Sequence, residues 1–434
     1  MTTKIILTTI VDEGIARDQW SNTVPRFRDS SPWVRVNLPD DFIQLPINTV
    51  LDMDIEGFVI HQIGTNHSVE WWSGFTQTAY TDDIMHPNVV EILPSKLMAR
   101  LRNKSAMVHY DQSLEAFPLV TNSINLYEHF YHNFKKFDLP PEQFIYTTCN
   151  LLEEEVHNKY CVENNISENN RMIVVASNFF AAATQTPGFF GHNNDNEISL
   201  LEHLEYKQNN EISLYNCLNR VIRGHRVALS AMLNYYNLID GQKISHDIYP
   251  MHWNTSINPF GFNSHPAFES NNITNIYSKL PLVLDTDQFQ INKAQHFFKD
   301  LYLQTYINVI TETFCTEYQN ESMFFSEKIF KPMRARQPFI LVGAPGSIKA
   351  LHDLGFKTFS KWFDESYSDI EDNTSRIEAV CKLLLELNKK TKTEWLEMYT
   401  EMEEVLNHNY DVLMQTHWTL KLRTILSNKV PHEL

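Results

Sequence analysis

The 434-residue chain has no long apolar run and few cysteines. No run approaches the roughly 18 consecutive apolar residues of a membrane span, and the N-terminus lacks the apolar core of a signal peptide. The cysteines are odd in number, scattered, and include no CxxC pair: Cys149, Cys161, Cys217, Cys315 and Cys381. This pattern argues against a structural zinc site and suits a reducing compartment. The sequence therefore predicts a cytoplasmic protein without a transmembrane segment.

Signatures of several enzyme classes are also missing. The chain contains neither GxxxxGK[ST] nor GxGxxG, so nucleotide hydrolysis on a P-loop and dinucleotide redox chemistry lack their phosphate cradles. The histidines are dispersed and form no HExxH motif. Positive charge is scarce as well, because 36 Lys and Arg face 53 Asp and Glu, a formal net charge of −17. That balance disfavours a nucleic-acid partner without excluding a locally basic site, and otherwise serves solubility.

The length and the apolar content predict two folded domains. A chain of this length exceeds one typical core, and hydrophobic and aromatic contents of 43% and 12% leave little room for extensive disorder. A polar stretch rich in Gly, Pro and Asn, residues 184–196, marks a linker. We predict an N-terminal α/β domain at residues 1–205, a second α/β domain at 211–390, and C-terminal helices at 391–434 that pack back on the first domain.

Short apolar runs alternate with helical patterns in the first half of the chain. The predicted helices are Ser123–Phe134 and Leu152–Asn164. The predicted strands are Lys4–Ile10, Gly57–Gln62, Ala106–His109, Gln143–Thr147 and Met172–Ala176. Near the C-terminus, helical patterns occupy Ser375–Leu387, Lys392–His408 and Asp411–Leu426. The alternation of strands and helices predicts an α/β fold class.

A basic turn follows a predicted strand early in the second half. Residues Ile212–Leu218 are the strand, the turn reads NRVIRGHR, and Val227–Tyr236 are a helix. Helix N-termini leave backbone N–H groups unpaired, and guanidinium groups add bidentate donors, so such a turn can hold an anion. Three arginines are candidates for that role: Arg220, Arg223 and Arg226. The alternative, a basic loop that only faces water, stays open.

The most informative pattern spans residues 307–359. One apolar run, Ile307–Ile310, ends before Glu312, and a second, Pro338–Val342, ends in the turn GAPG. The segment SEKIFKPMRAR lies between them, which is typical of a parallel βαβ unit. Such sheets bind ligands at the carboxyl ends of their strands, where carboxylates can accept from ribose hydroxyls and cations can hold phosphates. The candidates are Glu312, Glu327, Lys328 and Lys331. In a plainer interpretation Ser326 caps a helix and Glu327 only complements its dipole.

These motifs resemble a known family. The pattern EKxFKP…PFILVG…GFKTF is similar to the donor-binding motif of fucosyltransferase-like glycosyltransferases, and more so to a group of phage and marine-bacterial glycosyltransferase-like proteins. The turn NRxxRxHR is similar to the latter group too. The resemblance implies that Glu327 contacts the nucleotide ribose, that Lys328 contacts the diphosphate, and that an arginine of the early turn assists. It also implies two Rossmann-like domains facing a cleft, the GT-B type.

The implied activity is transfer of a sugar from a nucleotide-sugar donor to a glycan or other hydroxyl acceptor, with no cofactor and no metal. A general base must take the acceptor proton if the reaction inverts the anomeric centre. Asp111 and Glu115, after the strand Ala106–His109, are candidates, as are Asp12 and Glu13 after the first strand. Three alternatives stay open. They are a phage-type transferase acting on a modified DNA base, a non-catalytic nucleotide- or sugar-binding protein, and a metal-dependent transferase or phosphotransferase built on Asp285 and Asp287. Asp52 and Asp54 are a second pair with the same Asp-x-Asp spacing.

Overall fold

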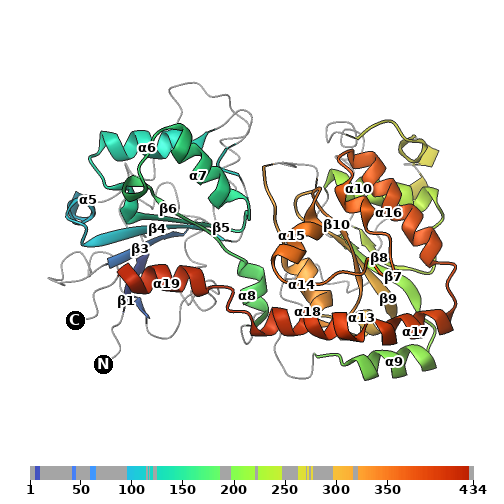
Figure 1. Cartoon of the computed structure of the whole chain (residues 1–434). Helices are drawn as coiled ribbons and strands as arrows, with labels where there is room; N and C mark the ends of the chain where they lie inside the picture. The colour runs from blue at the N-terminus through green and yellow to red at the C-terminus, as the bar shows by residue number, and fades with distance from the viewer. Residues whose placement is uncertain are drawn as a thin grey trace. The chain divides into compact units, whose positions relative to one another are not determined.

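The computed structural model divides into two compact units. It describes residues 5–9, 42–44, 59–64, 95–113, 116, 118–120, 125–185, 197–219, 223–246, 262–269, 271–272, 275–276, 297–315 and 321–429. The first unit combines Met1–Ala182 with His417–Leu434, and the second is Ala183–Thr416. Figure 1 shows an α/β arrangement in each of them.

The first unit is built on a six-stranded sheet in the order β2-β1-β3-β4-β5-β6. Every neighbouring pair is parallel. Its strands are β1 (Ile5–Thr9), β2 (Phe42–Gln44), β3 (Val59–Gly64), β4 (Ala106–Gln112), β5 (Phe144–Thr148) and β6 (Ile173–Ala176). Its helices include α5 (Ser95–Arg102), α6 (Leu126–Lys136), α7 (Glu153–Glu163) and α19 (Leu420–Lys429), while α8 (Phe179–Gln185) crosses the division between the units.

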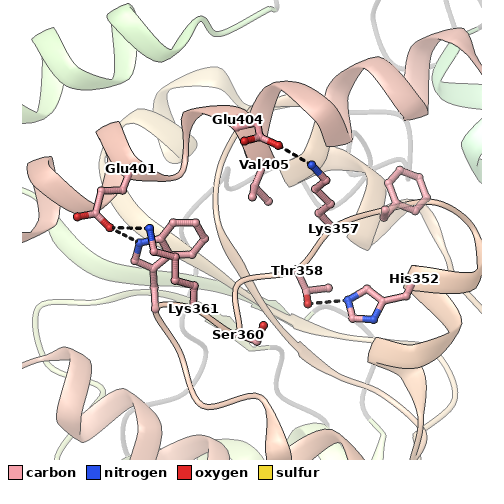
Figure 2. Close-up of a pocket in the computed structure, with 10 residues that line it drawn as sticks. His352, Lys357, Thr358, Ser360, Lys361, Glu401, Glu404 and Val405 are labelled. Atoms are coloured by element: carbon pink, nitrogen blue, oxygen red, sulfur yellow. Dashed lines mark hydrogen bonds and ion pairs between the residues drawn. The ribbon is translucent and has the colours of Figure 1, made fainter.

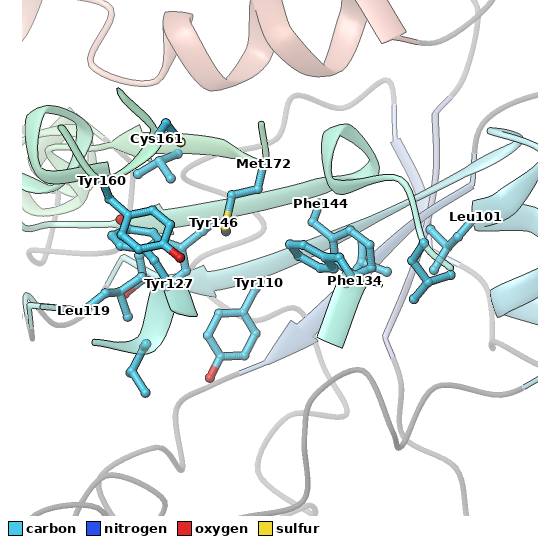
Figure 3. Packing of buried hydrophobic residues seen from close by; sticks show 14 of the residues in the cluster. Leu101, Tyr110, Leu119, Tyr127, Phe134, Phe144, Tyr146, Tyr160, Cys161 and Met172 are labelled. Atoms are coloured by element: carbon cyan, nitrogen blue, oxygen red, sulfur yellow. The ribbon is translucent and has the colours of Figure 1, made fainter. Parts of the chain in front are cut away.

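Aromatic side chains fill the core between this sheet and its helices (Figure 3). Tyr110 of β4 stacks on Tyr146 of β5, with ring centroids 5.7 Å apart. Phe134 of α6 packs on Phe144, with centroids 4.4 Å apart. Offset and tilted aromatic pairs of this kind contribute beyond their buried area. The C-terminal α19 joins the same unit, where Lys421 forms an ion pair with Glu154 of α7.

The second unit is built on a four-stranded sheet in the order β10-β9-β7-β8, again entirely parallel. Its strands are β7 (Ser213–Asn219), β8 (Lys243–His246), β9 (Thr305–Thr311) and β10 (Phe339–Val342). Its helices among the described residues are α9 (Leu200–Asn209), α10 (Gly224–Tyr235), α13 (Lys299–Leu303), α14 (Glu327–Arg334), α15 (Ser347–Asp353), α16 (Asn373–Leu387), α17 (Lys392–Glu401) and α18 (Glu403–Gln415). Figure 1 shows α10 and α16 on one face of this sheet and α14 and α18 on the other. Short 3-10 turns occur in both units, at Pro141–Gln143 and Glu168–Asn170 in the first and at Pro266–Phe268 and Ser366–Asp369 in the second.

A buried ammonium ties α9 to this sheet. Lys207 donates to the carbonyl oxygens of Tyr302, Leu303 and Thr305 at 3.2, 2.9 and 2.7 Å, and no part of it is exposed. These carbonyls belong to the end of α13 and the start of β9, so the ammonium satisfies groups that a short helix leaves unpaired.

The predicted domain limits, with the first domain ending at residue 205 and the second beginning at residue 211, remain predictions.

The predicted α/β class is confirmed, with parallel sheets in both units. Three details differ. The strand β4 runs on to Gln112, so Asp111 lies within it rather than after it, because the chain keeps pairing with Gly64 and with Thr147. The predicted helix Lys392–His408 is divided at Met402, whose N–H closes the last turn of α17 on the Met398 carbonyl. The short strands β2 and β8 were not predicted. No helix among the described residues is long and apolar enough to span a membrane.

Candidate functional site

The second sheet reverses its direction of growth between β7 and β9. From β7 the chain passes through α10 to β8 on one side, whereas β9, α14 and β10 build the sheet outward on the other. The loops that leave the carboxyl ends of β7 and β9 therefore diverge to opposite faces. Ligands of open parallel sheets bind at such a switch point. The two predicted motifs lie there, the basic turn after β7 and the carboxylate-bearing segment after β9.

Glu312 follows β9 and is buried, with 1% of its surface exposed. Its carboxylate accepts from the Ser326 hydroxyl at 2.6 Å, from the Ser326 N–H at 3.2 Å, and from the Thr313 N–H at 3.1 Å. Burial raises the pKa of Glu312, and the nearby Lys328 ammonium offsets part of that rise. These contacts are with the protein itself, so Glu312 holds the first turn of α14 in place.

Ser326 caps α14, as the plainer sequence interpretation expects, since its hydroxyl accepts from the Lys328 N–H at 3.4 Å. The side chain of Lys328 returns to this cap. Its ammonium donates to the Ser326 hydroxyl at 3.0 Å and to Thr313 Oγ1 at 3.4 Å, and lies 3.3 Å from Glu327 Oε1. Side-chain exposures of 25% for Lys328 and 14% for Glu327 leave both reachable by a ligand. The cap and a binding role are therefore compatible.

The charged side chains of α14 differ in exposure: Glu327 and Lys331 are partly exposed, whereas Arg334 is buried. Burial alone would raise the pKa of Glu327, but Lys328 and Lys331 outweigh it and hold that pKa below its ordinary value. Glu327 is thus an anion at neutral pH and an acceptor for hydroxyl groups. Lys331 is partly exposed, one turn further along the helix. Arg334, in contrast, is 2% exposed and lies over the Phe297 ring, so it faces the interior.

The basic turn after β7 meets the end of β9. Arg223 is the residue before α10, is partly exposed, and its guanidinium lies 5.7 Å from the centre of the Phe314 ring. Arg226 is 3% exposed and donates to the carbonyl oxygens of Thr311 and Glu312 at 3.3 and 3.4 Å. Burial lowers the pKa of Arg226 to about 10, which keeps it charged at neutral pH. Arg226 therefore fastens α10 to β9, and Arg220 lies outside the described residues.

Two residues that hold the loops after β7 and β9 in place were not predicted. His225 Nε2 lies 2.9 Å from the Glu312 carbonyl, beside the Arg226 contacts. Arg376 of α16 is buried and donates to the Cys315 carbonyl at 3.1 Å, which anchors the chain just past β9. His225 stands in the basic turn, whose strand–turn–helix pattern was the available signal. Arg376 is 61 residues from its partner along the sequence, and no local pattern indicates it.

The base candidates of the first unit have partly described surroundings. Asp111 lies in β4, and Glu115, Asp12 and Glu13 fall outside the described residues. The segment after β4 is fastened at two points. The Cys149 thiol donates to the Ser113 carbonyl at 2.6 Å, and Glu153 accepts from the Leu119 N–H at 3.3 Å. The carboxyl end of β4 is thereby linked to the segment between β5 and α7.

A pocket of about 410 Å³ lies elsewhere on the second unit (Figure 2). Its lining includes the ion pairs Lys357–Glu404 and Lys361–Glu401. His352, also in the lining, is hydrogen-bonded to the Thr358 hydroxyl. Phe359 beside it packs on Phe339, the first residue of β10. The pocket therefore lies toward the amino ends of the strands, and the candidate site toward their carboxyl ends.

No group of three or more His, Cys, Asp or Glu side chains within the described ranges could hold a metal ion. The acidic pairs that sequence analysis considered as metal ligands, Asp52 with Asp54 and Asp285 with Asp287, fall outside those ranges. Nothing about metal use follows from the described part of the chain.

Comparisons with known proteins give only distant structural likenesses. No family model matches the chain. No curated protein matches it either. An α,α-trehalose-phosphate synthase (UDP-forming) from Burkholderia vietnamiensis is 10% identical over 98% of this chain and 100% of its own, with a TM-score of 0.42. A UDP-GlcNAc 2-epimerase from Methanocaldococcus jannaschii is 10% identical over 89% and 93%, with a TM-score of 0.32. Spinosyn rhamnosyltransferase is 8% identical over 98% and 100%, with a TM-score of 0.33. Likenesses at this level carry no argument about activity.

Proposed function

We propose that the protein is a glycosyltransferase of the GT-B type that takes a sugar from a nucleotide-sugar donor, without a metal ion. One observation carries the proposal. At the switch point of the second sheet, an ionised Glu327 and the Lys328 ammonium stand together at the start of α14, beside the Arg223 turn. A carboxylate next to a cation cluster at a parallel-sheet switch point matches the two ends of a nucleoside diphosphate, its ribose and its phosphates.

The residues take separate roles in this proposal. Lys328 and Arg223, with Arg220 from the same turn, stabilise the negative charge that builds on the departing diphosphate. Lys331 adds a second positive charge to the same helix. Glu327 accepts from ribose hydroxyls. Glu312 and Arg226, both sequence-predicted donor contacts, instead fix the two loops relative to each other, as their buried contacts with Ser326 and the end of β9 indicate.

The acceptor side of the reaction rests on the first unit. A carboxylate there would take the proton from the attacking hydroxyl, and Asp111, Glu115, Asp12 and Glu13 remain the candidates. The acidic chain favours a glycan over a DNA acceptor.

The test is a thermal-shift panel on the full chain with UDP, GDP, ADP, CDP, dTDP and their common sugar conjugates, with and without EDTA. A ligand at about 100 times its dissociation constant stabilises the folded state by roughly 2.7 kcal/mol. We expect one nucleotide to raise the melting temperature of the wild type and of Lys349→Ala, a control for an exposed lysine elsewhere on the unit. The shift should be strongly reduced in Lys328→Ala and be indifferent to EDTA.

The other outcomes of this test would favour an alternative function or overturn the proposal. A shift that EDTA abolishes would favour the metal-dependent alternative. Binding without sugar transfer or donor hydrolysis would favour the non-catalytic binding protein. No shift with any nucleotide would overturn the proposal.

A further inference from the structure

The Ser326 hydroxyl is the meeting point of three groups at the candidate site. It lies 2.6 Å from Glu312 Oε2, 3.0 Å from the Lys328 ammonium and 3.4 Å from the Lys328 N–H. A serine hydroxyl has one proton to donate and two lone pairs to accept with. The carboxylate can only accept, and the ammonium and the N–H can only donate. The three contacts therefore use the full capacity of the hydroxyl, in one arrangement.

Capping a helix does not require this arrangement. An N-cap needs only the contact with the backbone N–H, and that contact is the longest of the three. The two shorter contacts involve charged groups, which form the stronger hydrogen bonds. Behind the hydroxyl, Glu312 is itself fixed by the N–H groups of Thr313 and Ser326. The Lys328 ammonium thus ends a chain of contacts that begins in the interior of the unit.

We propose that Ser326, backed by the carboxylate of Glu312, is a positioning residue that orients the Lys328 ammonium toward the diphosphate of the donor; this inference rests on the function proposed above. A lysine side chain is flexible, and holding it in its bound geometry before the ligand arrives lowers the entropic cost of binding. Without the hydroxyl, Thr313 and Glu327 remain as partners of the ammonium. Pairing with Glu327 then competes with phosphate for the same charge.

The decisive variant is Ser326→Gly, because glycine is a good N-cap residue and removes the hydroxyl at little cost to the helix. The probe is the nucleoside diphosphate that most stabilises the wild type, and its dissociation constant is measured by calorimetry. We expect Ser326→Gly to weaken binding by about tenfold or more, in line with loss of a hydrogen bond to a charged group. Ser326→Thr, which keeps a hydroxyl, should bind within about twofold of wild type.

A double-mutant cycle separates positioning from general damage. If Ser326 acts through Lys328, then Ser326→Gly should cost nothing further in a Lys328→Ala background. Losses that multiply in the double variant would overturn the proposal, as would wild-type affinity in Ser326→Gly. Thermal melting of each variant without ligand checks that the fold is kept.

A second readout needs no ligand. Acetic anhydride modifies free amines. The folded protein is treated with it and then digested, and mass spectrometry of the peptides gives the acetylation rate of each lysine. Without the Ser326 hydroxyl (Ser326→Gly), or without the carboxylate that holds it (Glu312→Gln), Lys328 should react about threefold to tenfold faster, while exposed Lys349 reacts as in wild type. An unchanged Lys328 rate would overturn the positioning role whatever the nucleotide panel shows. A raised rate in a protein that binds no nucleotide would refute the proposed function and leave the contact chain intact.

Discussion

At the scale of single residues, burial separates two kinds of charged side chain that look alike in the sequence. Arg223 and Arg226 stand three residues apart in one basic turn, yet Arg223 is partly exposed and Arg226 is held on the carbonyls that end β9. Glu312 and Glu327 differ in the same way. The sequence predicts which segments carry charge, but it does not show which charges contact protein groups distant along the chain. The proposed function therefore assigns ligand contact to the partly exposed members, Arg223 and Glu327.

Glu153 offers a test of buried charge in the first unit. Its carboxylate accepts from the Tyr127 hydroxyl at 2.7 Å, from Asn150 Nδ2 at 2.9 Å and from the Leu119 N–H at 3.3 Å. Burial raises the pKa of Glu153 despite these bonds. A raised folded-state pKa stabilises the protein below the ordinary pKa, and that contribution is lost as pH rises through the folded value. We therefore expect the melting-temperature advantage of wild type over Glu153→Gln to shrink between pH 4 and pH 7. Exposed Glu163→Gln, on the same helix, should show no such trend; a gap that widens with pH would contradict this account.

At the scale of elements, apolar runs predicted most strands and the caps predicted one helix start. The strands β5, β7, β9 and β10 are buried along nearly their whole length, as strands covered on both faces are, and each contains a short apolar run that predicted it within a residue or two. The strand β8, reading KISH, has too few apolar residues to be distinguished from a loop. Its pairing with β7 comes from the sheet, not from its own sequence. Ser326 was recognised as a cap, but its contact with Glu312 joins residues 14 apart.

The path of the chain through the first sheet bears on the general base. From β1 the chain passes to β2 on one side, whereas β3 and the remaining strands lie on the other, so this sheet has its switch point between β1 and β3. The chain that leaves β1 carries Asp12 and Glu13, while Asp111 belongs to β4, on the far side of β3. Ligand sites of such sheets favour the switch point.

We therefore expect Asp12→Asn or Glu13→Gln to slow turnover of the stabilising nucleotide sugar, measured as nucleoside diphosphate release, by about 100-fold or more. The nucleotide dissociation constant should stay near that of wild type, because the proposed donor residues lie in the other unit. Asp111→Asn and Glu115→Gln serve as the matched comparison. Loss of turnover confined to one of those two variants would return the role to the β4 segment and show that topology misplaces the base.

At the scale of the whole molecule, the net charge bears on whether the acceptor is DNA. The chain has 36 basic against 53 acidic residues, and its proposed phosphate-binding cations form one small cluster at the end of the second sheet. Binding to duplex DNA draws most of its affinity from many cations that displace counterions along the phosphate backbone. A cluster sized for one diphosphate does not supply that term.

This predicts how the protein responds to DNA. Fluorescence anisotropy with a labelled 20-base-pair duplex should show no binding at about 150 mM salt with micromolar protein, a concentration at which even non-specific DNA-binding proteins begin to bind. At about 20 mM salt any weak binding should be lost on modest salt addition, and charge reversal at Lys349 should matter as little as Lys328→Ala. Retained binding at 150 mM salt, lowered by Lys328→Ala and by excess nucleoside diphosphate, would instead place DNA at the donor cluster. The DNA-base transferase would then be the better reading, because an acidic protein that holds duplex DNA must concentrate its few cations on that substrate.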